Sequence, residues 1–143
     1  MDACSVLTRE EIKTLSGNRD PGAPSPGSYK AGDPVTTCYW QRTSPHSSVV
    51  LWSNVSPKEP KGAALKQVID HGKTARAVAG LGDDAFFVES AKEAPGGELF
   101  VRVGHWRLSI YREAASPLAK SESVLATLTA LAQAAVPKLR RAG

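Results

Sequence analysis

The chain has 143 residues, a length that fits one globular domain with its own hydrophobic core. Its hydrophobic share of 41% and charged share of 22% are ordinary for such a domain, and no apolar run approaches the roughly 20 residues that cross a bilayer. The net charge of +4 does not indicate nucleic-acid binding, because the dense basic group Lys138, Arg140 and Arg141 lies where cations complement a helix dipole. We expect a single domain over residues 1–143, with neither a nucleic-acid partner nor a transmembrane segment.

The first predicted element is a helix over residues 8–16. Thr8 and Glu11 have the spacing of a capping box, in which each side chain accepts a hydrogen bond from the other residue's amide. Gly17 can end the helix by adopting a left-handed conformation.

A proline- and glycine-rich segment follows, over residues 18–34. It contains four prolines and three glycines, a composition that predicts an exposed loop without regular structure. Because it is short and lies between Cys4 and Cys38, it does not divide the chain into two domains.

A hairpin and a second helix come next. Strands are predicted over residues 35–42 and 48–55, joined by a turn at residues 44–46. A helix is predicted over residues 61–72, because four apolar residues have the spacing of one helix face: Ala64, Leu65, Val68 and Ile69.

Four further strands are predicted, over residues 76–79, 85–90, 98–103 and 105–112. The last two alternate cleanly between apolar and polar residues, so each has one buried face. We expect six side chains to face the core: Leu99, Val101, Val103, Trp106, Leu108 and Ile110. Five should point the other way: Phe100, Arg102, Arg107, Ser109 and Tyr111.

A long helix is predicted to end the chain. Pro117 fits its first turn and Ser116 its cap, while Pro137 should kink or fray the last turn. Its apolar stripe is formed by Leu118, Leu125, Leu128, Ala132, Ala135 and Leu139. The order of elements is α-ββ-α-ββββ-α, which predicts an α+β fold with a largely antiparallel sheet and helices packed on one face.

The two cysteines lie where a short N-terminal segment could be bonded to the sheet. Cys4 comes directly before the first helix, and Cys38 lies inside a predicted strand. A single disulfide between them is expected, and with it an exported protein. Two alternatives stay open at this point: two buried free thiols, or a nucleophilic cysteine paired with His71.

Three short motifs carry a resemblance to a known group of proteins. The segment from Asp2 to Glu11 resembles the opening of short, exported, lipoprotein-type domains found mainly in actinobacteria, which have a Cys-Ser-Leu-Leu-Thr-like start. Cys38-Tyr39-Trp40 is similar to their Cys-x-Trp strand, and residues 80–87 resemble their glycine-aspartate-alanine-aromatic turn. The resemblance implies an α+β, sandwich-like domain of the cell envelope, mostly of unknown function and without known catalytic residues.

The start of the chain bears on its localisation. Residues 1–4 lack the charged start and apolar stretch of a signal peptide. We therefore expect a periplasmic, cell-envelope or secreted domain whose signal sequence is not included here. A lipid anchor on a cysteine further upstream is a further expectation.

The outward face of the last hairpin is the best candidate interaction surface. Phe100, Arg102, Arg107 and Tyr111 combine aromatic and arginine side chains, the types over-represented where partners bind. The alternative is that a helix covers this face and the residues are simply buried.

The sequence offers little for catalysis, and we expect neither metal nor cofactor. His46, His71 and His105 lack the spacing of zinc ligands, and the pair Asp83-Asp84 is typical of turns. The first expectation is therefore a non-enzymatic exported domain that binds a protein or an envelope ligand, through the sheet face or the proline-rich loop. Two alternatives are a small hydrolase with a site near His71, Asp83 and Asp84, and an immunity or inhibitor protein for a secreted toxin.

Overall fold

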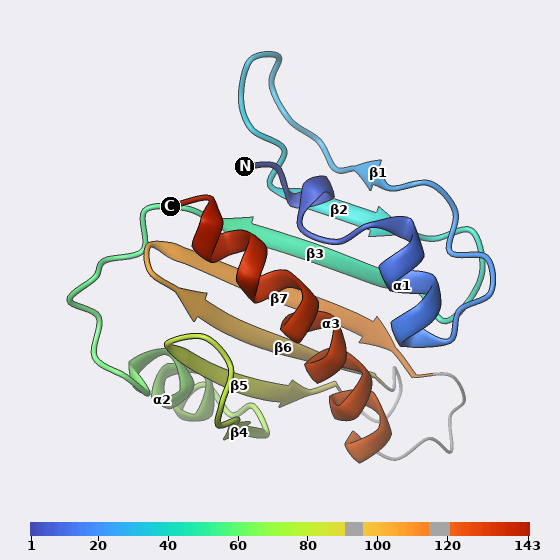
Figure 1. Cartoon of the computed structure of the whole chain (residues 1–143). Helices are drawn as coiled ribbons and strands as arrows, with labels where there is room; N and C mark the ends of the chain where they lie inside the picture. Colours follow the sequence, from blue (N-terminus) through green and yellow to red (C-terminus); the bar gives the residue numbers. More distant parts are fainter. Residues whose placement is uncertain (91–95, 115–120) are drawn as a thin grey trace.

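The computed structural model describes residues 1–90, 96–114 and 121–143 (Figure 1). A short 3₁₀ helix, three α-helices and seven strands are present in this part of the chain. Their bounds are η1 Ala3–Ser5, α1 Arg9–Ser16, β1 Ser25–Pro26, β2 Thr37–Trp40, β3 Ser47–Trp52, α2 Ala63–Asp70, β4 Ala75–Ala77, β5 Asp84–Glu89, β6 Gly96–Val103, β7 Trp106–Glu113 and α3 Ser121–Arg141.

All seven strands form one sheet, in the order β1-β2-β3-β7-β6-β5-β4. Every neighbouring pair is antiparallel. The pair β3–β7 joins the N-terminal strands to the C-terminal ones, so it lies near the middle of the sheet. The predicted α+β fold with an antiparallel sheet and helices packed on it is confirmed.

The prediction for residues 18–34 needs one correction, because this loop contains the strand β1. Ser25 pairs with Tyr39 and Pro26 with Cys38, and the amide of Gly27 donates to the carbonyl of Thr37 at 2.9 Å. A proline is tolerated in β1 because an edge strand needs no donor on its outer side. The proline-rich composition therefore marks a sheet edge as well as a loop.

One face of the sheet holds the hydrophobic core. The six side chains predicted to face inward on β6 and β7 are all buried there, together with Cys38, Trp40, Val49 and Leu51 from β2 and β3. α3 lies across β6 and β7, α1 packs against α3, and η1 covers β2 and β3 (Figure 1). We call this side of the sheet the first face.

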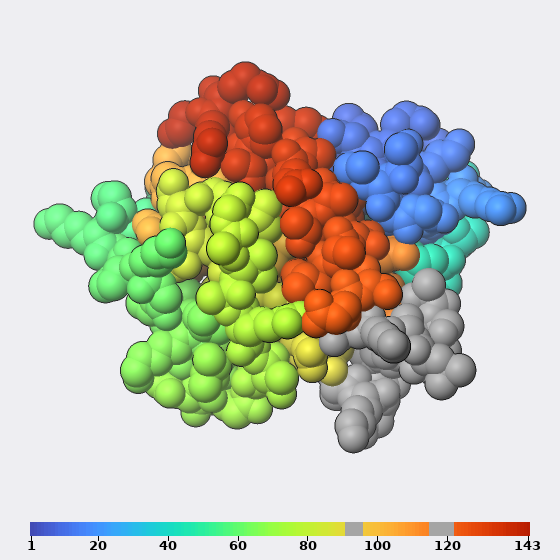
Figure 2. All heavy atoms as spheres, turned by 60° about the horizontal axis from the view of Figure 1, so that its bottom comes forward, coloured from blue at the N-terminus to red at the C-terminus, as the bar shows by residue number. Residues whose placement is uncertain are grey.

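The helix α2 lies on the opposite, second face, which corrects the expectation that all helices share one face. Figure 2 shows this from the β4 edge, with green α2 on one side of the sheet and orange-red α3 on the other. Asp84 faces the second face because it pairs with Arg102, and its Oδ2 accepts from the amide of Gly62 at 2.9 Å. This hydrogen bond holds the start of α2 against the second face.

The last helix continues to Arg141, so Pro137 does not end it, contrary to the expected fraying. Leu139 is fully buried two residues further on, and its packing keeps this turn helical. Of the predicted apolar stripe, Leu128, Ala132 and Ala135 are also fully buried and Leu125 is partly buried. The predicted cap and first turn, together with Leu118, fall outside the described residues.

α1 and α3 are joined by a charged contact. The predicted capping box of Thr8 and Glu11 is present, and the Glu11 carboxylate also forms an ion pair with Lys138 of α3. Burial acts to raise the pKa of Glu11, but the hydrogen bond and charge of Lys138 and the hydrogen bonds from Thr8 outweigh it and lower the pKa. The same carboxylate therefore caps one helix and binds another.

The predicted disulfide is confirmed. Cys4 and Cys38 are bonded, with their Cα atoms 5.1 Å apart, and Cys38 is fully buried. The amide of Ala3 also donates to the carbonyl of Val35 at 2.8 Å. Both contacts hold η1 beside β2. Because both cysteines are in the disulfide, the free thiols and the cysteine nucleophile are ruled out.

Removing the disulfide should be costly. For Cys4→Ala with Cys38→Ala we expect the free energy of unfolding to fall by about 3–4 kcal/mol, because the bond spans 34 residues and restricts the unfolded chain. Urea unfolding of the wild type and the variant measures the loss. Either single replacement should lose nearly as much as both together, and a loss below about 1 kcal/mol would contradict the expectation.

Stability should also depend on pH through Glu11. A lowered carboxyl pKa contributes stability that is present above the pKa of the unfolded chain and is lost as the pH falls through the folded-state pKa. Glu11→Gln, which keeps the cap, should therefore cost about 1 kcal/mol near neutral pH and progressively less as the pH falls through the lowered folded-state pKa of Glu11. Thermal or urea unfolding across this range tests it, with Asp70→Asn in the exposed Lys66–Asp70 pair as the control. An equal cost at both ends would refute the prediction.

Candidate functional site

The second face carries a row of charged and aromatic side chains across four strands. The strand register places Asp84 of β5 opposite Arg102 of β6, Arg102 opposite Arg107 of β7, and Arg107 opposite Trp52 of β3. Residues that pair across strands point to the same side of a sheet. All four side chains therefore lie on the second face.

An aromatic floor lies beside this row. Phe100 of β6 stacks on Phe86 of β5 with ring centroids 4.8 Å apart and on Trp52 with centroids 6.3 Å apart. Phe86 is buried, Phe100 is partly buried and Trp52 is 42% exposed. The floor thus runs from a buried end near β5 to an open end at Trp52.

A groove of about 370 Å³ separates this floor from α2. Ala64, Gln67 and Val68 of α2 form one wall, and residues 53–55 form another. No residue of α2 is buried, although the helix has an apolar stripe. Two residues of this stripe, Ala64 and Val68, therefore line the groove without being buried.

The segment before α2 is bound to the row of charged residues. Glu59 forms an ion pair with Arg107, and both side chains are about a quarter exposed. Since the Gly62 amide is bonded to Asp84, residues 59–62 are held at two points on the second face. Arg102 lines a much smaller cavity that shares Phe100 and Arg107 with the groove, and its Nε has no hydrogen-bond partner among the described residues.

The predicted interaction face is divided by this arrangement. Phe100 and Arg107 line the groove, and Arg102 lies next to it. Tyr111 lies further along β7, paired with Glu98 and Ser48, and does not line the groove. Its pKa is raised, first by burial and then by the nearby charges of Glu113 and Glu98.

The three residues of the hydrolase alternative each contact different parts of the structure. His71 is exposed, and its Nδ1 lies 2.7 Å from the carbonyl of Gln67. Asp83 accepts from the amide of Gly104 at 2.7 Å, while Asp84 accepts from Gly62. Among the described residues no hydrogen bond joins these three side chains, and neither His71 nor Asp83 lines the groove. In the same part of the chain, no three histidine, cysteine or carboxylate side chains lie together as metal ligands.

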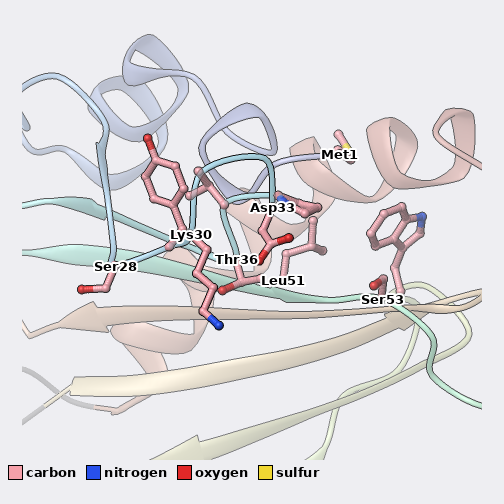
Figure 3. A pocket seen from close by; sticks show the side chains of 11 residues that line it. Met1, Ser28, Lys30, Asp33, Thr36, Leu51 and Ser53 are labelled. Carbon is pink, nitrogen blue, oxygen red and sulfur yellow. The ribbon is translucent and has the colours of Figure 1, made fainter.

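A second hollow, of about 380 Å³, lies beside the proline-rich loop. Figure 3 shows Lys30 and Asp33 of this loop and Thr36 just before β2, beside Leu51 and Ser53, with Met1 at the far end. Leu51 belongs to the first face, whereas the groove lies on the second, and Ser53 just beyond β3 lines both hollows. The other lining residues are Ser28, Tyr29, Pro34, Val35 and Trp106.

Two parts of the groove were missed by sequence reasoning. Trp52 and Phe86 could each be placed in a strand, but their approach to Phe100 depends on the strand order and register. The wall from α2 depends on the contacts of Glu59 and Gly62. The one local signal is the apolar stripe of the short helix predicted over residues 61–72.

Comparisons with known proteins do not identify the site. No family model, curated protein or solved structure matches the chain. Within the described residues, no helix combines the length and the apolar character needed to cross a bilayer. The site is therefore interpreted from its own residues.

The groove should behave as surface and the first face as core. Trp40 is fully buried and Trp52 is 42% exposed. Trp40→Ala should lower the free energy of unfolding by about 3–5 kcal/mol, and Trp52→Ala by less than half of that. Urea unfolding of both variants checks this, and equal losses would show that Trp52 belongs to the core.

Proposed function

We propose that this chain is a non-enzymatic, exported domain of the cell envelope that binds a protein or an envelope ligand through the groove on its second face. The observation that carries the proposal is the aromatic floor of Trp52, Phe100 and Phe86, which is open at Trp52. Aromatic and arginine side chains dominate binding energy at interfaces, and here Arg107 lies beside them.

The composition of the groove supports a binding role. Six of its lining residues are apolar, and Ser53, Asn54, Gln67 and Arg107 add a hydroxyl, two amides and a guanidinium. Ligand sites are typically apolar surfaces with a few polar groups that fix the orientation of the bound molecule. An immunity or inhibitor protein for a secreted toxin is a narrower version of the same proposal.

Export is supported by the disulfide. Disulfides such as Cys4–Cys38 form and persist mainly in oxidising compartments outside the cytosol. The resemblance to exported lipoprotein-type domains points the same way. A lipid anchor on a cysteine further upstream stays a prediction.

Affinity capture tests the proposal and distinguishes the two hollows. The oxidised domain and two variants are used as baits in a cell-envelope extract: Trp52→Ala, which opens the groove, and Tyr29→Ala, which alters the hollow at the proline-rich loop. Tyr29 is the matched control because it is also an exposed aromatic residue, 56% exposed. We expect one component to be retained by the wild type and by Tyr29→Ala and lost by Trp52→Ala.

The other outcomes are equally informative. Loss with Tyr29→Ala alone would move the binding site to the loop. Equal retention by all three baits, or retention by none, would contradict the proposed function. Thermal unfolding of each bait verifies that it is folded.

A further inference from the structure

We propose that the groove binds a small, largely apolar molecule that carries one anionic group. Its apolar body would lie between α2 and the aromatic floor, and its anionic group would meet Arg107. This inference rests on the proposed function and names the class of ligand for the same site.

The position of α2 provides the first argument. Helices with an apolar stripe normally bury that stripe, and protein interiors are packed without large voids. Here α2 packs mainly beside β4, while Ala64 and Val68 face the groove. The start of α2 lies close to the sheet, since Ala64 also lines the small cavity with Asp84 and Phe100, and the groove opens further along the helix at Val68. An apolar molecule in that space would give both surfaces the contact they lack.

The size and floor of the groove provide the second argument. Its volume of about 370 Å³ lies within the range of sites for small molecules, roughly 300–1,000 Å³. The stacked rings of Trp52, Phe100 and Phe86 give it a continuous apolar floor. Burying the exposed part of Trp52 would add favourable apolar contact to binding.

The third argument is the pair of arginines at the edge of the floor. Arg102 and Arg107 are directly opposite each other, an arrangement that is unfavourable for like charges. Two carboxylates offset this: Glu59 is paired with Arg107, and Asp84 is bonded to the amide of Gly62. Glu59 uses Nη2 of Arg107, so the remaining N–H groups of that guanidinium can donate to an anion.

The charge of the surrounding wall favours an anion as well. Residues 53–73, which include α2 and the segments on both sides of it, contain four lysines and two acidic residues. Both acidic residues are already paired, Glu59 with Arg107 and Asp70 with Lys66. Two of the chain's four net positive charges therefore come from this segment, which raises the local concentration of anionic ligands.

Two fluorescent probes with related ring systems separate the apolar and anionic contributions. Anilinonaphthalene sulfonate carries a negative charge, and phenylnaphthylamine has the same aromatic rings without it. Titration of the folded, oxidised domain should give one site per chain for each probe. We expect the sulfonate to bind about tenfold more tightly, the effect of one charge-assisted hydrogen bond.

Charge-neutral variants then test the role of Arg107. Arg107→Gln with Glu59→Gln removes the ion pair without changing the net charge, and should weaken the sulfonate about tenfold while leaving the uncharged probe unchanged. The matched control is Arg76→Gln with Glu122→Gln, which removes an ion pair outside the groove and should change neither affinity. Val68→Phe should fill the groove and abolish binding of both probes.

Competition identifies the ligand class more closely. Laurate should displace the sulfonate probe. In the wild type, methyl laurate should displace it about tenfold less well than laurate does, and in the Arg107 double variant the two should displace it equally well. Equal displacement in the wild type, or a sulfonate affinity unaffected by the double variant, would overturn the anionic assignment. If the domain sediments with phosphatidylglycerol vesicles but laurate does not displace the probe, the anionic assignment would also be overturned, in favour of a lipid surface.

The two proposals fail in different ways. In one outcome, the charge of the probe has no effect on binding while Trp52→Ala still fails to retain an envelope component that the wild type retains. In that case the ligand class is wrong and the binding role stands. If the charge dependence holds but no envelope component is retained by the wild type, the proposed cell-envelope role is wrong and the groove remains an anion-selective site.

Discussion

The antiparallel pairing of β3 with β7 is the contact on which the rest of the molecule depends. It joins the two parts of the sheet, which are the N-terminal strands β1–β3 and the C-terminal strands β4–β7. On the first face it places Val49 beside Ile110, within the core. On the second face the same register places Trp52 beside Arg107. A shift of one residue in this register would exchange the two faces and lose both the core and the groove.

The helices cover the two faces of the sheet to different extents. The first face is covered by α3, α1 and η1, and their positions are fixed by apolar burial, the ion pair of Glu11 with Lys138, and the disulfide. The second face is covered in part by α2, which is held at its start by the polar contacts of Glu59 and Gly62. Apolar packing fixes one layer, while a few polar contacts position the other and leave a hollow beneath it.

Much of the first face could be predicted from local patterns. The alternation of Leu99, Val101 and Val103 indicates one buried face without any knowledge of the partner strands, and the pair of cysteines indicated the disulfide. The capping box of α1 is also a local signal. The strand β1 was missed because its pairing depends on β2, and the groove because Trp52 and Phe86 reach Phe100 through the order of four strands. Patterns within one element predict which way side chains point, but not which distant side chains they meet.

The disulfide also fixes the point from which a tether at the start of the chain would leave the domain. Cys4 holds the start of the chain on β2, and Met1 lines the hollow beside Leu51 of the first face. The groove opens on the other face. A tether joined to residue 1 would therefore leave the domain at the first-face hollow, which shares Ser53 with the groove. The disulfide would keep that point of attachment beside β2 whichever way the tether bends.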